Sequence, residues 1–296
     1  MQLTFLGTSA MVPTKERNHS AIFLKYNAHG FLFDCGEGTQ RQMKIAEIKP
    51  SSITKIFISH WHGDHVLGIP GLLQTLAASE YAEILEIYGP KGTREAIYGL
   101  LKILPVNSNL RISVHDISKT KFLDTNEFYI EAYELEHNVT CLGYRLAEKD
   151  RLRINIHKAK EIGIPEGPLL GRLQRGQSIS FKGKHITPEE VTYVVKGRIF
   201  GYIADTRLCK NCINIAENAD LLVCEATYSD KQEEKASEYR HMTTKQAAFV
   251  AHQANVKKLV LTHFSQRYKD VNEVKEETRD IFPNTFAAHD FMKIKI

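Results

Sequence analysis

The chain has 296 residues, of which 43% are hydrophobic and 25% are charged, and its formal net charge is +4. This composition is typical of a globular protein with ample apolar material for a large α/β core, and the mild net charge alone does not indicate a polyanionic partner. No apolar run reaches the roughly 20 residues that span a bilayer, and the N-terminus lacks the charged-then-apolar pattern of a signal peptide.

The cysteines do not fit a disulfide framework, because they are odd in number and scattered along the chain. They are Cys35, Cys141, Cys209, Cys212 and Cys224. We therefore expect the protein to work in the reducing cytoplasm, without a membrane partner.

The N-terminal part of the chain is predicted to start with strands and then to alternate strands with helices. Apolar and β-branched runs indicate strands over residues 2–6, 20–26, 30–33, 53–59, 84–88 and 110–114. Helical patterns indicate helices over residues 39–47 and 92–104 and another that begins near residue 66. Thr39 is a candidate N-cap of the first helix. Residues 13–18 form a polar loop that contains a proline.

The run His-Trp-His-Gly-Asp-His at residues 60–65 holds four potential metal ligands directly after a predicted strand. Because side chains alternate along a strand, His60 and His62 can leave it on one side. The glycine turn then brings Asp64 and His65 back from another direction. Imidazoles suit a borderline metal such as Zn²⁺, and a carboxylate can join them or act as a base. The alternative is a polar loop that is merely rich in histidine, which this density of ligands after a buried strand disfavours.

The later part of the chain repeats the association of polar residues with strand ends. Strands are predicted over residues 128–135, 140–146, 198–204, 221–224, 258–262 and 291–296, and helices over residues 245–255 and 270–281. Thr243 is a plausible N-cap of the first of these helices. The polar residues at strand ends are His137, Asp205, Glu225 and His263. Open α/β sheets bind their ligands at such strand ends.

Residues 148–185 interrupt this pattern and show little periodicity. They contain nine basic residues against four acidic ones, so this segment carries more than the whole chain's surplus of positive charge. A clustered cationic excess is the footprint expected of a protein that binds a phosphate backbone. A solvated, charged loop is the alternative that composition alone leaves open.

Seven side chains are candidate metal ligands. They are His60, His62, Asp64, His65, His137, Asp205 and His263. Seven ligands exceed what one tetrahedral zinc ion takes and suit two ions that share a bridging group. Asp205 is the natural bridge, because a carboxylate has two oxygens. Two ions about 3.5–4 Å apart are used to hydrolyse phosphoesters, since they lower the pKa of water and clamp the attacking and leaving oxygens in line.

These motifs resemble those of the metallo-β-lactamase superfamily, and the whole chain resembles more narrowly the short form of the tRNase Z family. The matching stretches are Pro13-x-Lys15-x-Arg17-Asn18, Phe33-Asp34-Cys35-Gly36-Glu37-Gly38-Thr39-Gln40, the run at residues 60–65, Gly167-Pro168, Ala204-Asp205-Thr206-Arg207 and His263-Phe264-Ser265-x-Arg267-Tyr268. Two stretches depart from the family pattern. Its His-Glu-Ala-Thr is Cys-Glu-Ala-Thr at residues 224–227, and its His-Ser-Thr is His-Met-Thr at residues 241–243.

The resemblance implies an α/β fold, a four-layer αβ/βα sandwich in which residues 1–296 form a single domain. It also implies that residues 148–185 are an inserted basic arm, a protruding and flexible exosite that binds tRNA. The family works as a homodimer, in which the arm of one subunit presents tRNA to the active site of the other.

The resemblance further implies two Zn²⁺ ions per subunit, one held by His60, His62 and His137 and the other by Asp64, His65 and His263, with Asp205 bridging them. Asp64 would also orient or deprotonate the attacking water. Glu225 and His241 would form a dyad that protonates the leaving oxygen. Substrate contacts are expected at Lys15, Arg17, Asn18, Gly167, Pro168, Arg207 and Arg267.

The implied activity is endonucleolytic removal of the 3′ trailer from precursor tRNA, leaving a 3′-hydroxyl on the tRNA and a 5′-phosphate on the trailer. One alternative is a hydrolase of the same superfamily that acts on a small molecule, such as a phosphodiesterase. Another is a metal-free RNA-binding relative, against which the seven intact ligands argue. The Cys-x-x-Cys pair at residues 209 and 212 permits a zinc or redox interpretation, but without a second cysteine pair incidental thiols are favoured.

Overall fold

The computed structural model describes residues 1–104, 106 and 110–296, and these residues divide into two compact units. The main unit comprises residues 1–123, 130–146 and 199–296, and the small unit comprises residues 124–129 and 147–198. No helix within the described residues combines the length and apolarity needed to cross a membrane.

The main unit contains two seven-stranded sheets within the described residues. The first has the order β18 (Lys293–Lys295), β1 (Gln2–Gly7), β2 (Ala21–Tyr26), β3 (His29–Phe33), β4 (Lys55–Phe57), β5 (Ile84–Gly89) and β6 (Arg111–Asp116). The second has the order β17 (Thr285–Ala287), β16 (Leu259–Thr262), β15 (Leu221–Glu225), β14 (Ile199–Ile203), β9 (Cys141–Glu148), β8 (Phe128–Leu135) and β7 (Lys121–Asp124). Strands β3 to β6 run parallel to one another, as do β14 to β17, so each sheet gathers the carboxyl ends of several strands along one edge.

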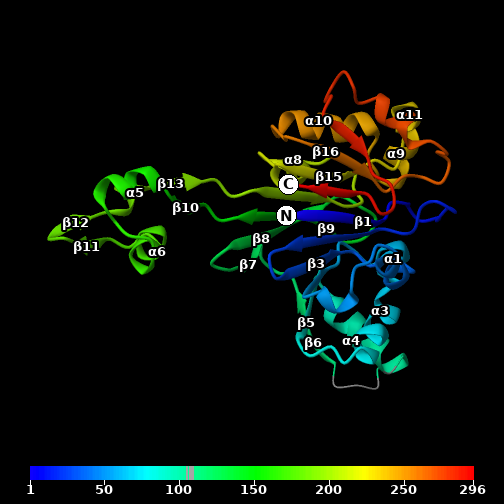
Figure 1. Cartoon of the computed structure of the whole chain (residues 1–296). Helices are drawn as coiled ribbons and strands as arrows, with labels where there is room; N and C mark the ends of the chain where they lie inside the picture. Colours follow the sequence, from blue (N-terminus) through cyan, green and yellow to red (C-terminus); the bar gives the residue numbers. More distant parts are fainter. Residues whose placement is uncertain (105, 107–109) are drawn as a thin grey trace. The chain divides into compact units, whose positions relative to one another are not determined.

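Helices cover the outer face of each sheet, which gives the four layers seen in Figure 1. The first sheet carries α1 (Thr39–Ile45), the 3₁₀ turn η1 (Pro50–Ser52), α2 (Gly63–Val66), α3 (Ile69–Ala78) and α4 (Thr93–Ile103). The second sheet carries α8 (Lys210–Ala216), the 3₁₀ turn η2 (Asp230–Gln232), α9 (Glu233–Tyr239), α10 (Thr244–Gln253) and α11 (Val271–Glu276). The αβ/βα sandwich expected from the sequence is confirmed.

The two sheets pack face to face through aromatic side chains. On β3, Leu32 points to the helical layer, whereas Phe33 points to the second sheet and lies 5.3 Å from Phe200 and 5.9 Å from Tyr144 between ring centroids. This alternation follows from the twofold period of a strand. Burial of these aromatic rings supplies much of the apolar area that stabilises the sandwich.

The small unit has a hydrophobic core of its own, although its sequence predicted no regular structure. Five buried side chains form this core: Ile164, Leu173, Ile179, Ile186 and Val191. The unit contains β10 (Arg151–Ile154), α5 (Ile156–Ile162), α6 (Pro168–Gln174), β11 (Ile179–Phe181), β12 (Lys184–Ile186), α7 (Pro188–Val191) and β13 (Thr192–Val195). Ile164 lies between α5 and α6, and the other four core residues lie on α6, β11, β12 and α7. The expectation of an irregular segment is therefore wrong. Elements of three to seven residues leave too little periodicity to detect, and tertiary packing stabilises them instead.

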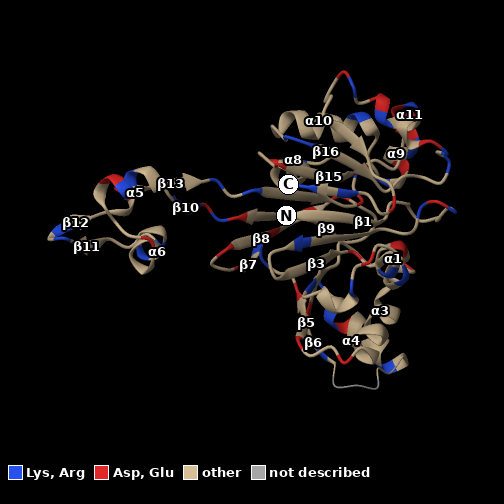
Figure 2. Ribbon diagram, viewed as in Figure 1, with Lys and Arg blue, Asp and Glu red and all other residues tan. Residues whose placement is uncertain are grey.

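Basic side chains are spread over the elements of the small unit, as Figure 2 shows for α5, α6 and the β11–β12 hairpin. Two contacts join the ends of its longer segment. The Glu148 amide donates to the Arg198 carbonyl at 2.9 Å, and the two side chains form an ion pair at 2.6 Å. The chain therefore enters and leaves this unit at neighbouring points.

Several predicted boundaries need correction. Gly38, in the left-handed conformation with φ 76°, precedes α1, so Thr39 is the first helical residue and not the N-cap. The helix expected near residue 66 is two helices, and the first of them begins at Gly63. The helix predicted over residues 270–281 is the shorter α11. The N-cap role of Thr243 is confirmed, since its side chain accepts from the Gln246 amide at the start of α10.

Candidate metal centre and acid dyad

The candidate ligands lie at the carboxyl ends of strands from both sheets. His60 and His62 follow β4, and Asp64 and His65 lie on α2 directly after them. From the second sheet, His137 follows β8, Asp205 follows β14 and His263 follows β16. The edge position predicted from the strand pattern is thus where these residues lie.

The first ligand group consists of His60, His62, His137 and Asp205. His62 Nδ1 lies 3.0 Å from His60 Nε2 and 3.3 Å from His137 Nε2. Asp205 Oδ2 lies 3.7 Å from His60 Nε2 and 3.9 Å from His137 Nε2. Two ligands of a tetrahedral zinc ion are about 3.3 Å apart when each bond is about 2.0–2.1 Å long, so these distances suit one metal ion.

The second ligand group consists of Asp64, His65, Asp205 and His263. His263 Nε2 lies 3.3 Å from His65 Nε2, 3.3 Å from Asp64 Oδ2 and 3.3 Å from Asp205 Oδ1. His65 Nε2 completes the set at 3.4 Å from Asp64 Oδ2 and 3.5 Å from Asp205 Oδ1. The four donor atoms are again spaced as around a single cation.

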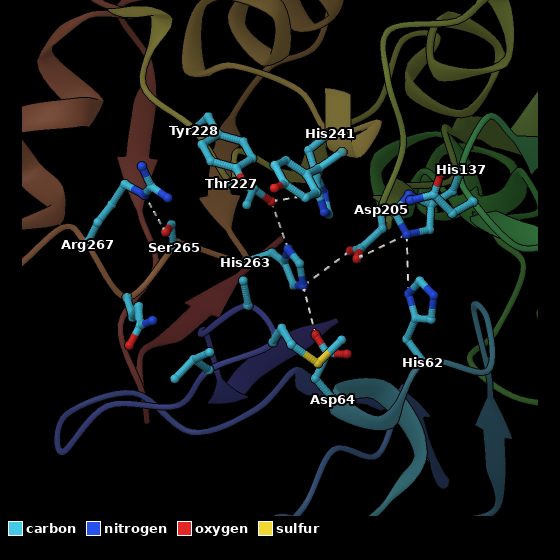
Figure 3. A pocket seen from close by; sticks show the side chains of 16 residues that line it. His62, Asp64, His137, Asp205, Thr227, Tyr228, His241, His263, Ser265 and Arg267 are labelled. Atoms are coloured by element: carbon cyan, nitrogen blue, oxygen red, sulfur yellow. Dashed lines mark hydrogen bonds and ion pairs between the residues drawn. The ribbon is translucent and has the colours of Figure 1, made fainter. Parts of the chain in front are cut away.

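Asp205 is the member that the two groups share, and it presents a different oxygen to each. Its Oδ2 faces His60 and His137, and its Oδ1 faces His65 and His263. Figure 3 shows Asp205 between His263 on one side and His62 and His137 on the other. Asp205 Oδ1 and Asp64 Oδ1 are buried and have no hydrogen-bond partner among the described residues. A buried carboxylate oxygen left in this way is costly unless a cation binds it, so Asp205 Oδ1, which faces His65 and His263, fits a metal ion.

Burial and the neighbouring charges set the ionisation of the ligands. Burial lowers the pKa of His60 well below its usual value, so this imidazole keeps a free lone pair. Burial raises the pKa of Asp205, but the nearby His263 and His65 outweigh it, and the pKa lies well below the usual value. Burial lowers the pKa of His65, yet the charges of Asp205, Asp34 and Asp64 raise it well above normal. Three carboxylates around one imidazole create a strong demand for positive charge.

The rest of the protein orients four of the histidines through their Nδ1 atoms, which leaves Nε2 directed at the neighbouring ligands. The Nδ1 atoms lie 2.9 Å from Ser59 Oγ (His60), 2.8 Å from Asp34 Oδ2 (His65), 3.1 Å from the Arg240 carbonyl (His137) and 2.9 Å from Thr227 Oγ1 (His263). Such bonds fix the ring orientation and the tautomer of metal-binding histidines.

Asp34 is a functional residue to which the sequence reasoning gave no role. It is fully buried at the end of β3 and accepts hydrogen bonds from the Ser59 amide, the Ser59 hydroxyl and the Tyr202 hydroxyl, in addition to His65. The available signal was a carboxylate directly after an apolar strand, the same signal that identified Asp205. Asp34 and His263 both adopt the left-handed backbone conformation, with φ 56° and 60°.

We expect Asp34→Asn to weaken metal binding or cleavage by about 10–100-fold, the usual effect of removing an outer partner of a metal-binding histidine. The amide nitrogen would face donors that now point at a carboxylate. Zinc affinity measured in competition with a chelator tests this. Tyr202→Phe removes one bond to Asp34 but keeps the bond to His65, so it is the matched control with a smaller effect. Equal zinc affinities for Asp34→Asn and the wild type would contradict the role of Asp34.

A histidine–carboxylate pair, His241 and Glu225, lies beside the ligand groups. His241 Nδ1 is 2.9 Å from Glu225 Oε1, and the buried Glu225 also accepts from the Thr206 amide and from the Thr227 amide and hydroxyl. Burial lowers the pKa of His241, but the charge and hydrogen bond of Glu225 outweigh burial and raise it to about 9. A protonated imidazole held by an ionised carboxylate can serve as a general acid near neutral pH.

A cavity of about 360 Å³ gives access to both features. The ligands and the dyad contribute His62, Asp64, His137, Asp205, His241 and His263 to its lining, and Thr227 lies beside them. The remaining lining residues include Met11, Val12, Tyr228, Tyr239 and Arg267. The Arg267 guanidinium lies 5.3 Å from the centre of the Tyr228 ring, and its Nε donates to the Ser265 hydroxyl at 2.9 Å. Figure 3 shows Arg267 and Tyr228 on the side away from His62.

The other predicted substrate contacts do not line this cavity. Lys15 is exposed, whereas Arg17 is buried and donates to the Ser265 carbonyl. The Asn18 amide donates to Asp290, and its side chain donates to the Glu37 carbonyl. Arg207 is exposed and pairs with Glu136. Gly167 and Pro168 belong to the small unit, where they begin α6.

Two family models match parts of the chain. The model of the anti-Pycsar protein Apyc1 matches residues 1–141, and the model of the beta-lactamase superfamily domain matches residues 173–264. Together they cover most of the strands whose ends carry the ligands.

Known proteins match the chain over its full length. Ribonuclease Z of Methanothermobacter thermautotrophicus is 42% identical over 297 residues, which cover 100% of this chain and 97% of that protein. Ribonuclease Z of Lactococcus lactis subsp. lactis is 40% identical over 306 residues, and the match covers 100% of this chain and 100% of that protein. Among solved structures, the short form of human tRNase Z is similar, with a TM-score of 0.74 and 30% identity over 100% of this chain and 99% of that one. The metallo-beta-lactamase fold protein YhfI from Bacillus subtilis shares the fold, with a TM-score of 0.72 and 18% identity. The chain therefore belongs to the ribonuclease Z family, with the metallo-β-lactamase fold.

Proposed function

We propose that this protein is the endonuclease that removes the 3′ trailer from precursor tRNA, leaving a 3′-hydroxyl on the tRNA and a 5′-phosphate on the trailer. The observation that carries the proposal is the division of the two Asp205 oxygens between two ligand groups, beside a histidine–glutamate dyad on the same cavity. Phosphodiester hydrolysis needs both parts, because charge develops on the phosphoryl oxygens while the leaving oxygen needs a proton.

The cofactor is two Zn²⁺ ions per subunit in this proposal. One is held by His60, His62, His137 and Asp205, and the other by Asp64, His65, His263 and Asp205. Such ions supply positive charge that stabilises the developing negative charge and favours deprotonation of water.

The protein's own groups then move the protons. Asp64 keeps one carboxylate oxygen free of hydrogen bonds among the described residues, so it can orient the attacking water or accept its proton. His241, protonated through its contact with Glu225, gives its proton to the departing 3′ oxygen of the tRNA. Thr227 ties this dyad to the ligands, since its hydroxyl lies within 3.2 Å of His241 Nδ1 and 2.9 Å of His263 Nδ1.

Substrate recognition in this proposal extends beyond the cavity. Arg267 and Arg207 contact phosphates near the cut, and the loop of Lys15, Arg17 and Asn18 senses the 3′ end of the tRNA. The small unit, with Gly167 and Pro168, binds the body of the tRNA through its basic side chains. The protein acts as a homodimer in the cytoplasm, a location that suits its five free cysteines.

The direct test is incubation of the zinc-loaded protein with a precursor tRNA, with the cut mapped to the nucleotide and the new ends identified chemically. We expect one cut at the boundary of the trailer and none after chelation of the metal. Random cutting, or turnover of small phosphodiesters without any cut in precursor tRNA, would favour the small-molecule hydrolase instead.

Excision of residues 151–195, which form most of the small unit, separates these two functions. The Lys196 side chain pairs with Asp150 at 2.7 Å, so an Asn-Gly turn can join residues 150 and 196 in place of residues 151–195. We expect kcat/KM for precursor tRNA to fall by on the order of 10²-fold or more, because many phosphate contacts are lost. Hydrolysis of bis(p-nitrophenyl) phosphate, which needs only the cavity, should persist.

A milder variant controls for damage to the fold. Lys182→Ala with Lys184→Ala removes two charges from the β11–β12 hairpin without touching the buried core of the small unit. It should weaken tRNA binding less than the excision does. Undiminished processing of precursor tRNA by the excised protein would remove the small unit from the recognition mechanism.

A further inference from the structure

A pair of thiols that the proposed mechanism does not use lies four and seven residues after Asp205. Cys209 precedes α8 in an extended conformation, with φ −141° and ψ 166°, and Cys212 lies in the first turn of that helix. Their sulfur atoms are 3.6 Å apart, and a disulfide requires them to approach to about 2.05 Å.

The two cysteines of the pair differ in exposure, whereas the other three cysteines are all buried. Cys209 is partly exposed, whereas Cys212 is fully buried directly behind it. Cys35, Cys141 and Cys224 are buried. A reagent in solution therefore meets Cys209 first, and Cys212 is placed to react with whatever Cys209 acquires.

The acidity of the thiols supports the same division of roles. The hydrogen-bond contact with the Cys212 sulfur lowers the pKa of Cys209 to about 6. The same contact, together with burial, raises the pKa of Cys212 well above its usual value. Burial also raises the pKa of Cys35 to about 12 and that of Cys224 well above normal. Cys209 is thus mostly thiolate at neutral pH, the reactive form.

A metal site at this pair lacks ligands. The groups of three or more metal-binding side chains in the described part of the chain are those of the metal centre and the dyad, and none includes Cys209 or Cys212. Two thiolates alone do not complete a zinc site, which takes four ligands.

We propose that Cys209 and Cys212 form a redox-active dithiol, and that its oxidation by a low-molecular-weight disulfide slows the enzyme. The Cys209 thiolate attacks one sulfur of the small disulfide, which releases one small thiolate and leaves a mixed disulfide on Cys209. Cys212 then loses its proton to solvent and attacks Cys209 Sγ, which expels the second small thiolate. Two protein thiols are oxidised and one small disulfide is reduced to two thiols.

The connection to the active site passes through Thr206, the residue after Asp205. Thr206 Oγ1 lies 3.9 Å from Cys209 Sγ and accepts from the Glu136 amide, next to His137. The Thr206 amide donates to Glu225, the carboxylate of the dyad. Disulfide formation moves the Cys209 sulfur toward Cys212 and so alters the surroundings of Thr206. Thr206 holds the segment after β8, through Glu136, and the end of β15, through Glu225.

The effect on rate rests on the proposed function, whereas formation of the disulfide does not. The experiment treats the zinc-loaded protein with excess oxidised glutathione, removes the reagent, and measures the intact mass and the single-turnover rate on precursor tRNA. We expect a loss of two hydrogen atoms in mass and a fall in rate of at least about fivefold, the lower end of usual coupling between two sites. Reduction with dithiothreitol should restore both.

Two variants make each step visible. Cys212→Ser should stop at the mixed disulfide and gain the mass of one glutathione unit, and Cys209→Ser should gain nothing on the same timescale. Alkylation of the wild type by iodoacetamide should label Cys209 first, with an apparent pKa near 6.

The outcomes are separable. An unchanged mass after oxidation, or labelling of Cys209 no faster than that of free cysteine, overturns the dithiol. A disulfide that leaves the rate unchanged overturns its effect on the enzyme. Failure of the reduced protein to cut precursor tRNA would count against the proposed function and leave the thiol result standing.

Discussion

Replacing Asp205 by asparagine is expected to reduce cleavage by at least about 10⁴-fold, comparable with removing a member of a catalytic unit. Asp205 gives one oxygen to each ligand group, and asparagine can give an oxygen to only one of them. The other group would face an amide NH₂, which cannot bind a cation and points hydrogens at it. The side chain keeps its size, so a change in packing does not explain the loss.

Elemental analysis of the purified variant tests the structural half of this prediction, and we expect fewer zinc ions per chain than in the wild type. Asp116→Asn is the matched control, because Asp116 also ends a strand, β6, but belongs to neither ligand group. That control should keep its metal and its rate. An Asp205→Asn protein with full zinc content and a normal rate would refute the shared-carboxylate arrangement.

Replacing His241 by alanine is expected to slow the single-turnover cleavage of precursor tRNA by about 10²–10⁴-fold, the usual contribution of a positioned general acid. Zinc content should remain unchanged, because His241 belongs to neither of the two ligand groups that share Asp205. His252→Ala is the control, since His252 is an exposed histidine on α10. A normal single-turnover rate for His241→Ala would remove this residue from the mechanism.

The pH dependence gives an independent readout of the dyad. As the acid, His241 must carry its proton, so the rate should fall as the pH rises through the pKa of His241, which Glu225 raises to about 9. In Glu225→Gln the negative charge is absent and the pKa of His241 falls. The alkaline limb of the pH–rate profile should therefore move to lower pH in that variant, a shift that a purely structural role of Glu225 would not produce.

The resemblance implied the sandwich, and the local pattern of strands predicted the position of the site, because open α/β sheets bind ligands at strand ends. Apolar and β-branched runs over residues 30–33 and 53–59 predict buried strands, and a charged residue immediately after such a strand lies at the sheet edge. That reasoning located Asp205 and His263 before any contact between them was known. The number of ligands and the two oxygens of a carboxylate predicted Asp205 as the bridge, but which histidines face each of its oxygens depends on how the two sheets face each other.

Features set by long-range packing escaped prediction. The small unit consists of elements too short to show periodicity, and its regular structure depends on a core assembled from side chains such as Ile164, Leu173 and Val191. Strands β7 and β17, of four and three residues, were missed because they lie at the edges of their sheet and owe their conformation to their neighbours. Asp34 was missed because its partners, Tyr202 among them, lie far away in the sequence.

The left-handed backbone at Asp34 and His263 means that this centre is maintained against the local preference of the chain. Each such residue costs of order 1–3 kcal/mol, which the surrounding network has to offset. Glycine would relax the backbone at either position but would delete a ligand or its anchor. Adaptation of this fold to heat must therefore leave these two positions as they are and gain its stability at sites remote from the chemistry.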